Sequence, residues 1–177
     1  MTQLIIGPMF SGKTTEMLRR LTRYSLAGRR VVLVRPSCDT REQLTHDNLQ
    51  HNFFCYTTDK ISKIFDEIIR ADVIGVDEGQ FFEGLAKDVD RLSGYGRTVI
   101  VSGLNATSER KPFKEIQNLI PLSEQITKLN AVCSKCGSDF GSFSYYKSGV
   151  KNEDVMIGAQ DLYTSLCRNC YDKTIKG

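Results

Sequence analysis

Residues 7–14 (GPMFSGKT) could hold the phosphates of a nucleotide. Their order, Gly7, Pro8, Met9, Phe10, Ser11, Gly12, Lys13 and Thr14, fits the pattern G-x-x-x-x-G-K-[ST] in full. In such a loop the backbone N–H groups wrap a phosphate, and the next helix N-terminus adds partial positive charge. Lys13 can reach the outer phosphates, and the Thr14 hydroxyl can ligate magnesium. The pattern therefore predicts a site for ATP and Mg²⁺.

A second candidate group follows the apolar run at residues 73–76, which ends in Asp77 and Glu78. Such a pair is by itself typical of a solvated turn. Beside a phosphate loop, however, Asp77 is placed to hold magnesium together with Thr14. Glu78 could then take the proton of an acceptor hydroxyl.

Four of the six cysteines form two C-x-x-C pairs, Cys133/Cys136 and Cys167/Cys170. Each pair can turn two thiolates toward one ion, and four sulfurs complete a tetrahedral zinc site with no open position for catalysis. We therefore expect structural zinc, with a redox dithiol as the alternative. Residues 137–166, between the pairs, would form a hairpin or a lasso. Cys38 and Cys55 are expected to be buried or half-exposed thiols.

The elements that must position these groups alternate along the chain. Short apolar runs predict strands at residues 3–6, 30–34, 73–76 and 98–101. Apolar residues at helical spacing predict helices at 14–27, 61–70 and 84–92, and polar stretches predict loops at 37–52 and 103–115. This order indicates a P-loop NTPase-like α/β fold, a parallel sheet flanked by helices, with ligands at the carboxyl ends of the strands. We expect an ATP-binding domain at 1–128 and a small zinc-ribbon or lasso domain at 129–177.

Composition limits the remaining classes. The 177 residues carry a net charge of +3 and no apolar run long enough to cross a bilayer, which argues against membrane and nucleic-acid partners. Without a signal-peptide pattern, a soluble protein of the cytoplasm is expected. Arg19, Arg20 and Arg23 should form a solvated helix face, and His46 and His51 should be loop residues.

The strings GPMFSGKT (7–14), DEGQFF (77–82) and RKPF (110–113), followed by the two cysteine pairs, resemble the thymidine kinase family of the cellular and poxvirus type. The resemblance covers nearly the whole chain. It implies transfer of the ATP γ-phosphate to the 5′-hydroxyl of thymidine, with Glu78 as the base and Asp39 and Arg41 near the reacting groups. It also implies a homo-oligomer, commonly a tetramer.

The same resemblance implies a thymidine pocket that a lasso closes, lined by Met9, Phe81, Leu104, Phe113, Met156, Ile157, Gly158 and Tyr163. The chain departs from the family at two positions: Ser108 stands where an aromatic residue is usual, and Asn105 where an acid is usual. The loss of one stacking face weakens a base site by ~0.5–1.5 kcal/mol.

Three alternatives stay open at this point. Because of Ser108, the acceptor could be another deoxynucleoside, such as deoxyuridine or deoxycytidine. An ATP-driven nucleic-acid-binding protein would use the zinc module to grip DNA or RNA, although the mild charge argues against it. A regulator that binds nucleotide without turnover is disfavoured by the intact set of Lys13, Thr14, Asp77 and Glu78.

Overall fold

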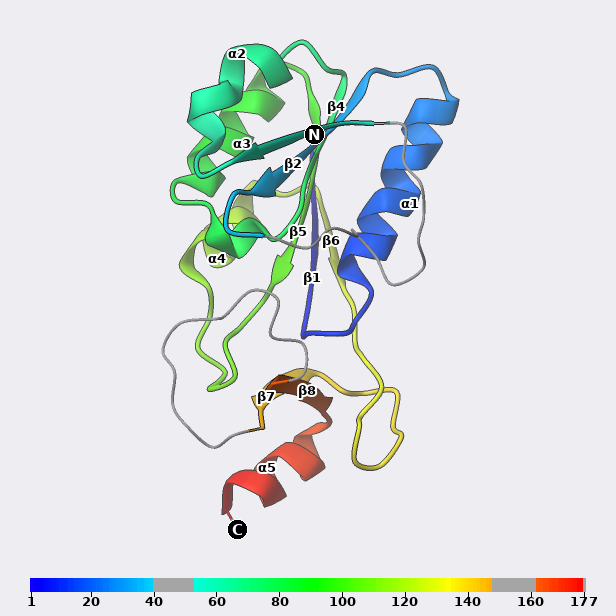
Figure 1. Ribbon diagram of the computed structural model, residues 1–177, viewed down its shortest axis with the longest axis vertical. Helices are drawn as coiled ribbons and strands as arrows, with labels where there is room; N and C mark the ends of the chain where they lie inside the picture. The colour runs from blue at the N-terminus through cyan, green and yellow to red at the C-terminus, as the bar shows by residue number, and fades with distance from the viewer. Residues whose placement is uncertain (40–52, 148–161, 177) are drawn as a thin grey trace.

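A six-stranded parallel sheet forms the centre of the computed structural model, which describes residues 1–39, 53–147 and 162–176. The strand order is β3-β2-β4-β5-β1-β6. Figure 1 shows the sheet with α1 on one side and α2, α3 and α4 on the other. The strands are β1 (Thr2–Gly7), β2 (Val31–Pro36), β3 (Phe54–Thr58), β4 (Val73–Val76), β5 (Thr98–Leu104) and β6 (Gln125–Lys128), and all adjacent pairs are parallel. The carboxyl ends of β4, β5 and β1 are therefore neighbours.

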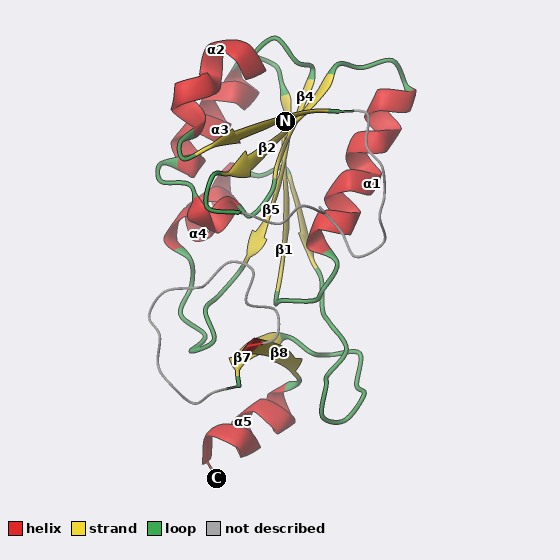
Figure 2. Ribbon diagram, viewed as in Figure 1, coloured by secondary structure: helices red, strands yellow, loops and turns green. Residues whose placement is uncertain are grey.

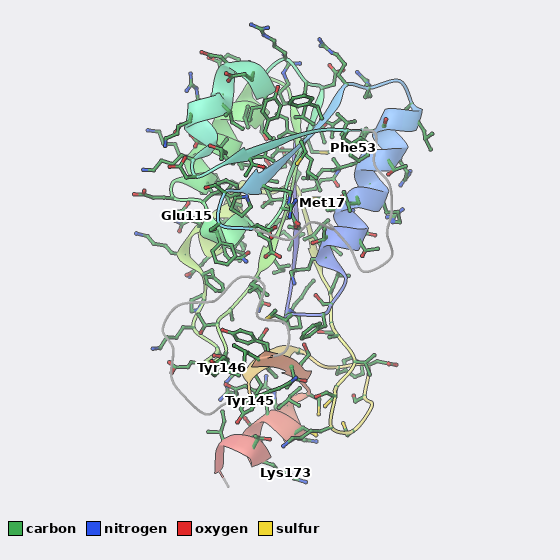
Figure 3. The ribbon with its side chains drawn as sticks, in the orientation of Figure 1. Met17, Phe53, Glu115, Tyr145, Tyr146 and Lys173 are labelled. Carbon is green, nitrogen blue, oxygen red and sulfur yellow. The ribbon has the colours of Figure 1, made fainter. Side chains whose placement is uncertain are left out.

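Helices cover both faces of this sheet (Figure 2). Side chains alternate along a strand, so Leu4 and Ile6 enter one apolar cluster and Ile5 enters the other. On the Ile5 side lies α1 (Lys13–Leu26), whose Met17 points at the sheet (Figure 3). The other face is covered by the 3-10 turn η1 (Ile61–Ile64), α2 (Phe65–Ile68), α3 (Leu85–Gly94) and α4 (Lys114–Leu119).

Close packing of α1 on the sheet depends on Gly75 in β4. A Cβ atom at this position would lie 2.5 Å from Leu21 Cδ1 of α1. A side chain there would force Leu21 of α1 out of its place against the sheet.

A smaller unit follows β6. It contains β7 (Phe143–Tyr146) and β8 (Tyr163–Leu166), which pair antiparallel, and α5 (Arg168–Lys176). Tyr171, Leu166 and Cys133 form its buried centre, and Tyr145 packs against them (Figure 3). Among the residues that the structure describes, no helix has both the length and the hydropathy to cross a membrane.

The predicted α/β fold is confirmed, and four strands and two helices lie where the sequence places them. The prediction of a continuous helix at 61–70 is wrong. The chain forms η1 and then α2, with a break in the helical conformation at Ile64 (φ −117°, ψ 18°). The loop predicted at 103–115 is shorter at both ends in the structure, since β5 runs to Leu104 and α4 begins at Lys114. The strands β3 and β6 were not predicted.

Candidate functional site

The phosphate loop leaves β1 at Gly7, where only glycine fits. A Cβ atom there would lie 2.6 Å from the Leu129 carbonyl oxygen and 2.6 Å from Ser11 Oγ. Gly12 caps α1 in the left-handed conformation, with φ 76°. Phe10 also has positive φ, 62°, which is uncommon for a residue with a side chain and is typical of functional loops.

The carbonyl of Pro8 fixes the shape of this loop from inside. It accepts hydrogen bonds from Ser11 Oγ at 2.9 Å and from Lys13 Nζ at 2.7 Å. The lysine ammonium group is thus held over the loop, where a phosphate bound by the backbone N–H groups would meet it.

Asp77 lies 1% exposed, directly after β4, and is held by two hydroxyl groups. Thr14 Oγ1 lies 3.0 and 3.2 Å from the two carboxylate oxygens, and Ser102 Oγ donates to Oδ1 at 2.5 Å. The structure therefore brings the two predicted magnesium ligands together. Hydroxyl and carboxylate oxygens are the donors that Mg²⁺ prefers, so this pair fits the ion.

Ser102 was missed by the sequence reasoning. It sits in β5, between β4 and β1, and is 0% exposed. A serine inside a buried apolar strand was the available signal, because a buried hydroxyl needs a polar partner.

Glu78 follows Asp77 in the left-handed conformation (φ 52°, ψ 45°), an outlier for a residue with a long side chain. Its carboxylate accepts a hydrogen bond of 2.7 Å from Gln80 Nε2, and Gln80 Oε1 accepts the Leu104 N–H at 2.9 Å. Gln80 was also missed, although it joins the candidate base to the end of β5.

Asp39 lies after β2 and is 7% exposed. Its carboxylate pairs with Arg35 at 2.9 Å. Burial of the Cys38 sulfur raises the pKa of that thiol, and the charges of Asp39 and Glu78 raise it further. The two predicted carboxylates therefore lie close to one thiol. Arg41 lies outside the described residues.

Cys38 and Cys55 are both exposed residues, so neither is a buried thiol, but the protein covers part of each sulfur and this partial burial raises the pKa of both thiols.

The expected nucleoside-pocket residues come from several elements. Leu104 and Tyr163 are buried, and Met9, Phe81 and Phe113 are half-buried. Leu104 ends β5 and Phe113 caps α4, while Tyr163 begins β8 and packs on the Tyr146 ring at a centroid distance of 5.1 Å. Met156, Ile157 and Gly158 lie outside the described residues.

The four cysteines of the C-x-x-C pairs meet at one point. Cys133, Cys136, Cys167 and Cys170 have sulfur atoms that all lie within 4.8 Å of one another, and Cys136 Sγ is 3.7 Å from Cys167 Sγ. Zinc with Zn–S bonds of about 2.3 Å requires sulfur separations of about 3.8 Å. All four are free thiols, so the cluster fits a zinc ion.

The local field around this cluster already favours one thiolate. Burial raises the pKa of Cys133, but backbone N–H groups of Cys167, Cys136 and Lys135 outweigh it and lower the pKa to about 6. Hydrogen bonding to Cys167, together with burial, raises the pKa of Cys170 to about 12. A cation bound to all four sulfurs would remove the remaining protons.

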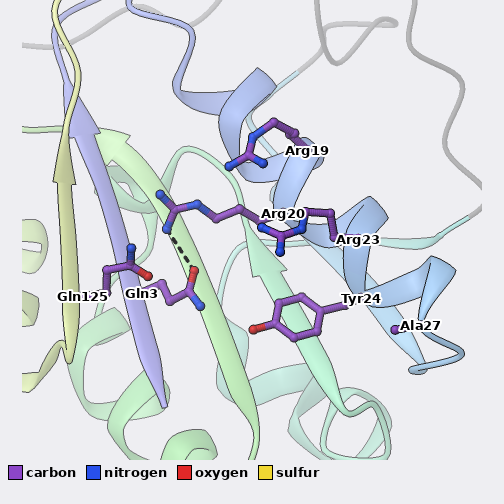
Figure 4. Close-up of a pocket in the computed structure, with 7 residues that line it drawn as sticks. All are labelled: Gln3, Arg19, Arg20, Arg23, Tyr24, Ala27 and Gln125. Atoms are coloured by element: carbon purple, nitrogen blue, oxygen red, sulfur yellow. Dashed lines mark hydrogen bonds between the residues drawn. The ribbon is translucent and has the colours of Figure 1, made fainter.

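A cavity of about 370 Å³ lies apart from these groups, along the polar face of α1 (Figure 4). None of its lining residues belongs to the phosphate loop; they are Gln3, Arg19, Arg20, Arg23, Tyr24, Ala27 and Gln125. The prediction that the arginines of α1 form a solvated face is wrong for Arg20, which is 8% exposed. Its guanidinium donates to Glu16 at 2.8 Å, to Gln3 at 2.9 Å and to Thr127 at 2.9 Å, so it joins α1 to the sheet.

Comparisons of the sequence with protein families and with individual proteins both point to thymidine kinases. The family model described as thymidine kinase matches residues 1–171. The chain is similar to the thymidine kinase of raccoon poxvirus, with 46% identity over 172 residues, 96% of this chain and 95% of that protein. It is similar to that of vaccinia virus strain Ankara at 45% identity over the same shares. Among solved structures, domain III of the Thermotoga maritima replication initiation protein DnaA matches with a TM-score of 0.42 and 11% identity, over 73% of this chain and 54% of that one. That structural similarity is too weak to support an argument.

Proposed function

The chain belongs to the thymidine kinase family, and we infer from this membership and from the site that it phosphorylates thymidine with ATP. The observation that carries the inference is the contact of the buried Asp77 with Thr14, which joins the phosphate loop to the strand end that bears Glu78. The product would be thymidine 5′-monophosphate.

In this proposal residues 7–14 hold the ATP phosphates. The backbone N–H groups and Lys13 bind and orient the γ-phosphate for in-line attack. Thr14 and Asp77 would hold magnesium, which neutralises charge on the phosphates when it is bound. Ser102 fixes the rotamer of Asp77 through its hydrogen bond, so that the carboxylate is in place before the ion arrives.

Glu78 is proposed as the base that takes the proton of the thymidine 5′-hydroxyl. Its left-handed backbone and its bond to Gln80 hold the carboxylate at the end of β4, beside the phosphate loop. Asp39 and Arg41 are proposed to lie near the reacting hydroxyl and the transferring phosphoryl group, as the family resemblance implies.

Further residues are proposed to bind the nucleoside. Met9, Phe81, Leu104, Phe113 and Tyr163 would line the pocket, and residues 156–158 would close over the base. Zinc on the four cysteines would be structural, because every tetrahedral position is filled by sulfur. We also propose a boundary near residue 128 between the two domains, a cytoplasmic location and a homotetramer.

A product assay tests this function. The purified protein is incubated with ATP, Mg²⁺ and each of thymidine, deoxyuridine, deoxycytidine, deoxyadenosine and deoxyguanosine. Thymidine monophosphate as the main product supports the proposal. A different monophosphate would retain the kinase chemistry and place the error at the loop around Ser108. ATP hydrolysis without any nucleotide product would refute it.

A further inference from the structure

Two serines of the C-terminal unit hold one residue of the phosphate loop. Ser144 of β7 and Ser165 of β8 are directly opposite each other in the two-stranded sheet, and they are 5% and 2% exposed. The Met9 N–H donates to Ser144 Oγ at 3.0 Å. Ser165 Oγ donates to the Met9 carbonyl at 2.5 Å. Both backbone polar groups of Met9 are thus bound by this serine pair.

This contact determines what Met9 can do in the loop. Its N–H is used by Ser144, so Met9 contributes loop shape, and the phosphate-facing N–H groups must come from later residues. The carbonyl of the preceding residue, Pro8, is bound by Lys13 and Ser11 from within the loop. The loop is therefore fixed on one side by its own side chains and on the other by the serine pair.

The serine pair is in turn fixed by the cysteine cluster. Cys167 follows Ser165 by two residues. The Ser165 carbonyl accepts the N–H of Ser134 at 3.0 Å, and Ser134 lies between the ligands of the first cysteine pair. Any shift of the cysteines that would accompany metal loss reaches Ser165 through these short connections.

We propose that Ser144 and Ser165 are positioning residues for the phosphate loop, and that they transmit the metal state of the four-cysteine cluster to ATP affinity. This inference deepens the proposed function and rests on it for the identity of the nucleotide. The serines touch no reacting atom; they act through Met9.

Alanine variants test the positioning role. Ser144→Ala leaves the Met9 N–H without its serine partner, and Ser165→Ala does the same to the Met9 carbonyl. We expect each to weaken equilibrium binding of ATP by about tenfold, the value of one neutral hydrogen bond at the upper end of its usual range. Because both hydroxyls hold the same residue, the double variant should lose less than the product of the two single effects.

A matched control lies two residues before Ser144. Ser142→Ala removes a hydroxyl that donates to Asn130 at 2.9 Å. This bond involves neither the phosphate loop nor Ser134, so the control should bind ATP as the unchanged protein does. Zinc content should be one per chain in Ser142→Ala, in Ser144→Ala, in Ser165→Ala and in the double variant. ATP affinity equal to that of the unchanged protein in Ser144→Ala and Ser165→Ala would overturn the proposal.

Removal of the metal tests the transmission. A chelator selective for Zn²⁺ over Mg²⁺, applied to the unchanged protein with Mg²⁺ in excess, should weaken ATP binding as much as the double alanine substitution does. In the double variant the chelator should have no further effect on ATP binding. If the chelator weakens ATP binding in the double variant as much as in the unchanged protein, the proposal that the serines transmit the metal state is overturned. If ATP binding depends on the two serines as expected but the unchanged protein forms no thymidine monophosphate, the proposed function fails. The positioning role of Ser144 and Ser165 is still supported in that case.

Discussion

Replacement of Glu78 by Gln isolates the basicity of this side chain from its geometry. Gln has nearly the same shape, and its carbonyl oxygen can still accept the hydrogen bond that Gln80 donates to Glu78 at 2.7 Å. The left-handed backbone at φ 52° already carries a side chain of this length. The change therefore removes the charge and the proton acceptor while the end of β4 keeps its structure.

A general base contributes about 10²–10⁴ in rate, or ~2.7–5.4 kcal/mol of barrier at 1.36 kcal/mol per decade. We expect Glu78→Gln to lower kcat by about 10²-fold or more, because the 5′-hydroxyl proton loses its acceptor. The KM for ATP should stay within about twofold, since Glu78 makes no proposed contact with the phosphates. Steady-state formation of thymidine monophosphate at varied ATP measures both constants.

The matched control is Glu83→Gln, five positions later in the sequence. The Glu83 side chain is 80% exposed and pairs with Lys60 at 2.7 Å, so its loss should leave kcat unchanged. Wild-type turnover in Glu78→Gln would refute the assignment of the base. Equal losses in both variants would point to a general effect of charge on the protein.

Three further substitutions give separable outcomes. Ser102→Ala should raise the Mg²⁺ concentration for half-maximal rate by about 10- to 100-fold, the value of a hydrogen bond to a charged group, and an unchanged Mg²⁺ midpoint would contradict the role of Ser102. Cys170→Ser should bring zinc below one per chain by elemental analysis and lower the unfolding temperature, whereas full zinc retention would count against the four-sulfur site. The hydrogen bond from Arg19, with other arginine contacts, lowers the pKa of Glu16 from 4.5 to about 2. Its stabilisation is therefore complete above pH 4.5 and is lost as the pH falls through about 2. Glu16→Gln should thus be less stable in chemical unfolding at pH 7, by an amount that shrinks on acidification, and a growing difference would refute the assignment.

The parts of the fold that local sequence patterns specify were predictable. Buried parallel strands are nearly continuous apolar runs, which is why β1, β4 and β5 were recognised. By contrast, β6 reads Gln-Ile-Thr-Lys, is largely exposed and, among the residues that the structure describes, lies at the edge of the sheet beside β1. An edge strand of this kind carries little apolar signal, so only its pairing identifies it.

Helix periodicity misled the prediction at residues 61–70 for a related reason. The apolar spacing there is correct, because Ile61, Phe65 and Ile68 all enter the core. The chain reaches the same contacts with a 3-10 turn followed by a short helix. Periodicity reports which side chains are buried, and several backbone paths can bury the same set.

In the site, too, residues marked by a local sequence pattern were predicted, and residues that act through contacts distant in the sequence were not. Residues 7–14 form one contiguous motif, and Asp77 follows its own strand, so both were found from the sequence. Ser102 and Gln80 act across gaps of 25 and 24 residues, on Asp77 and Leu104 respectively. Such contacts depend on strand order, which no spacing in the sequence reveals.

The contacts of Ser108 limit what its departure from the family pattern can change. Its carbonyl accepts a hydrogen bond of 2.5 Å from the Tyr171 hydroxyl, and this bond does not depend on the side chain at 108. Arg110 in the same loop stacks on the Tyr171 ring at 4.7 Å and pairs with Asp172 at 3.3 Å. The loop is thus tied to α5 through its backbone and through Arg110. The effect of Ser108 on nucleoside selectivity must then come from the missing aromatic face itself, because the loop that would carry that face is already held in position.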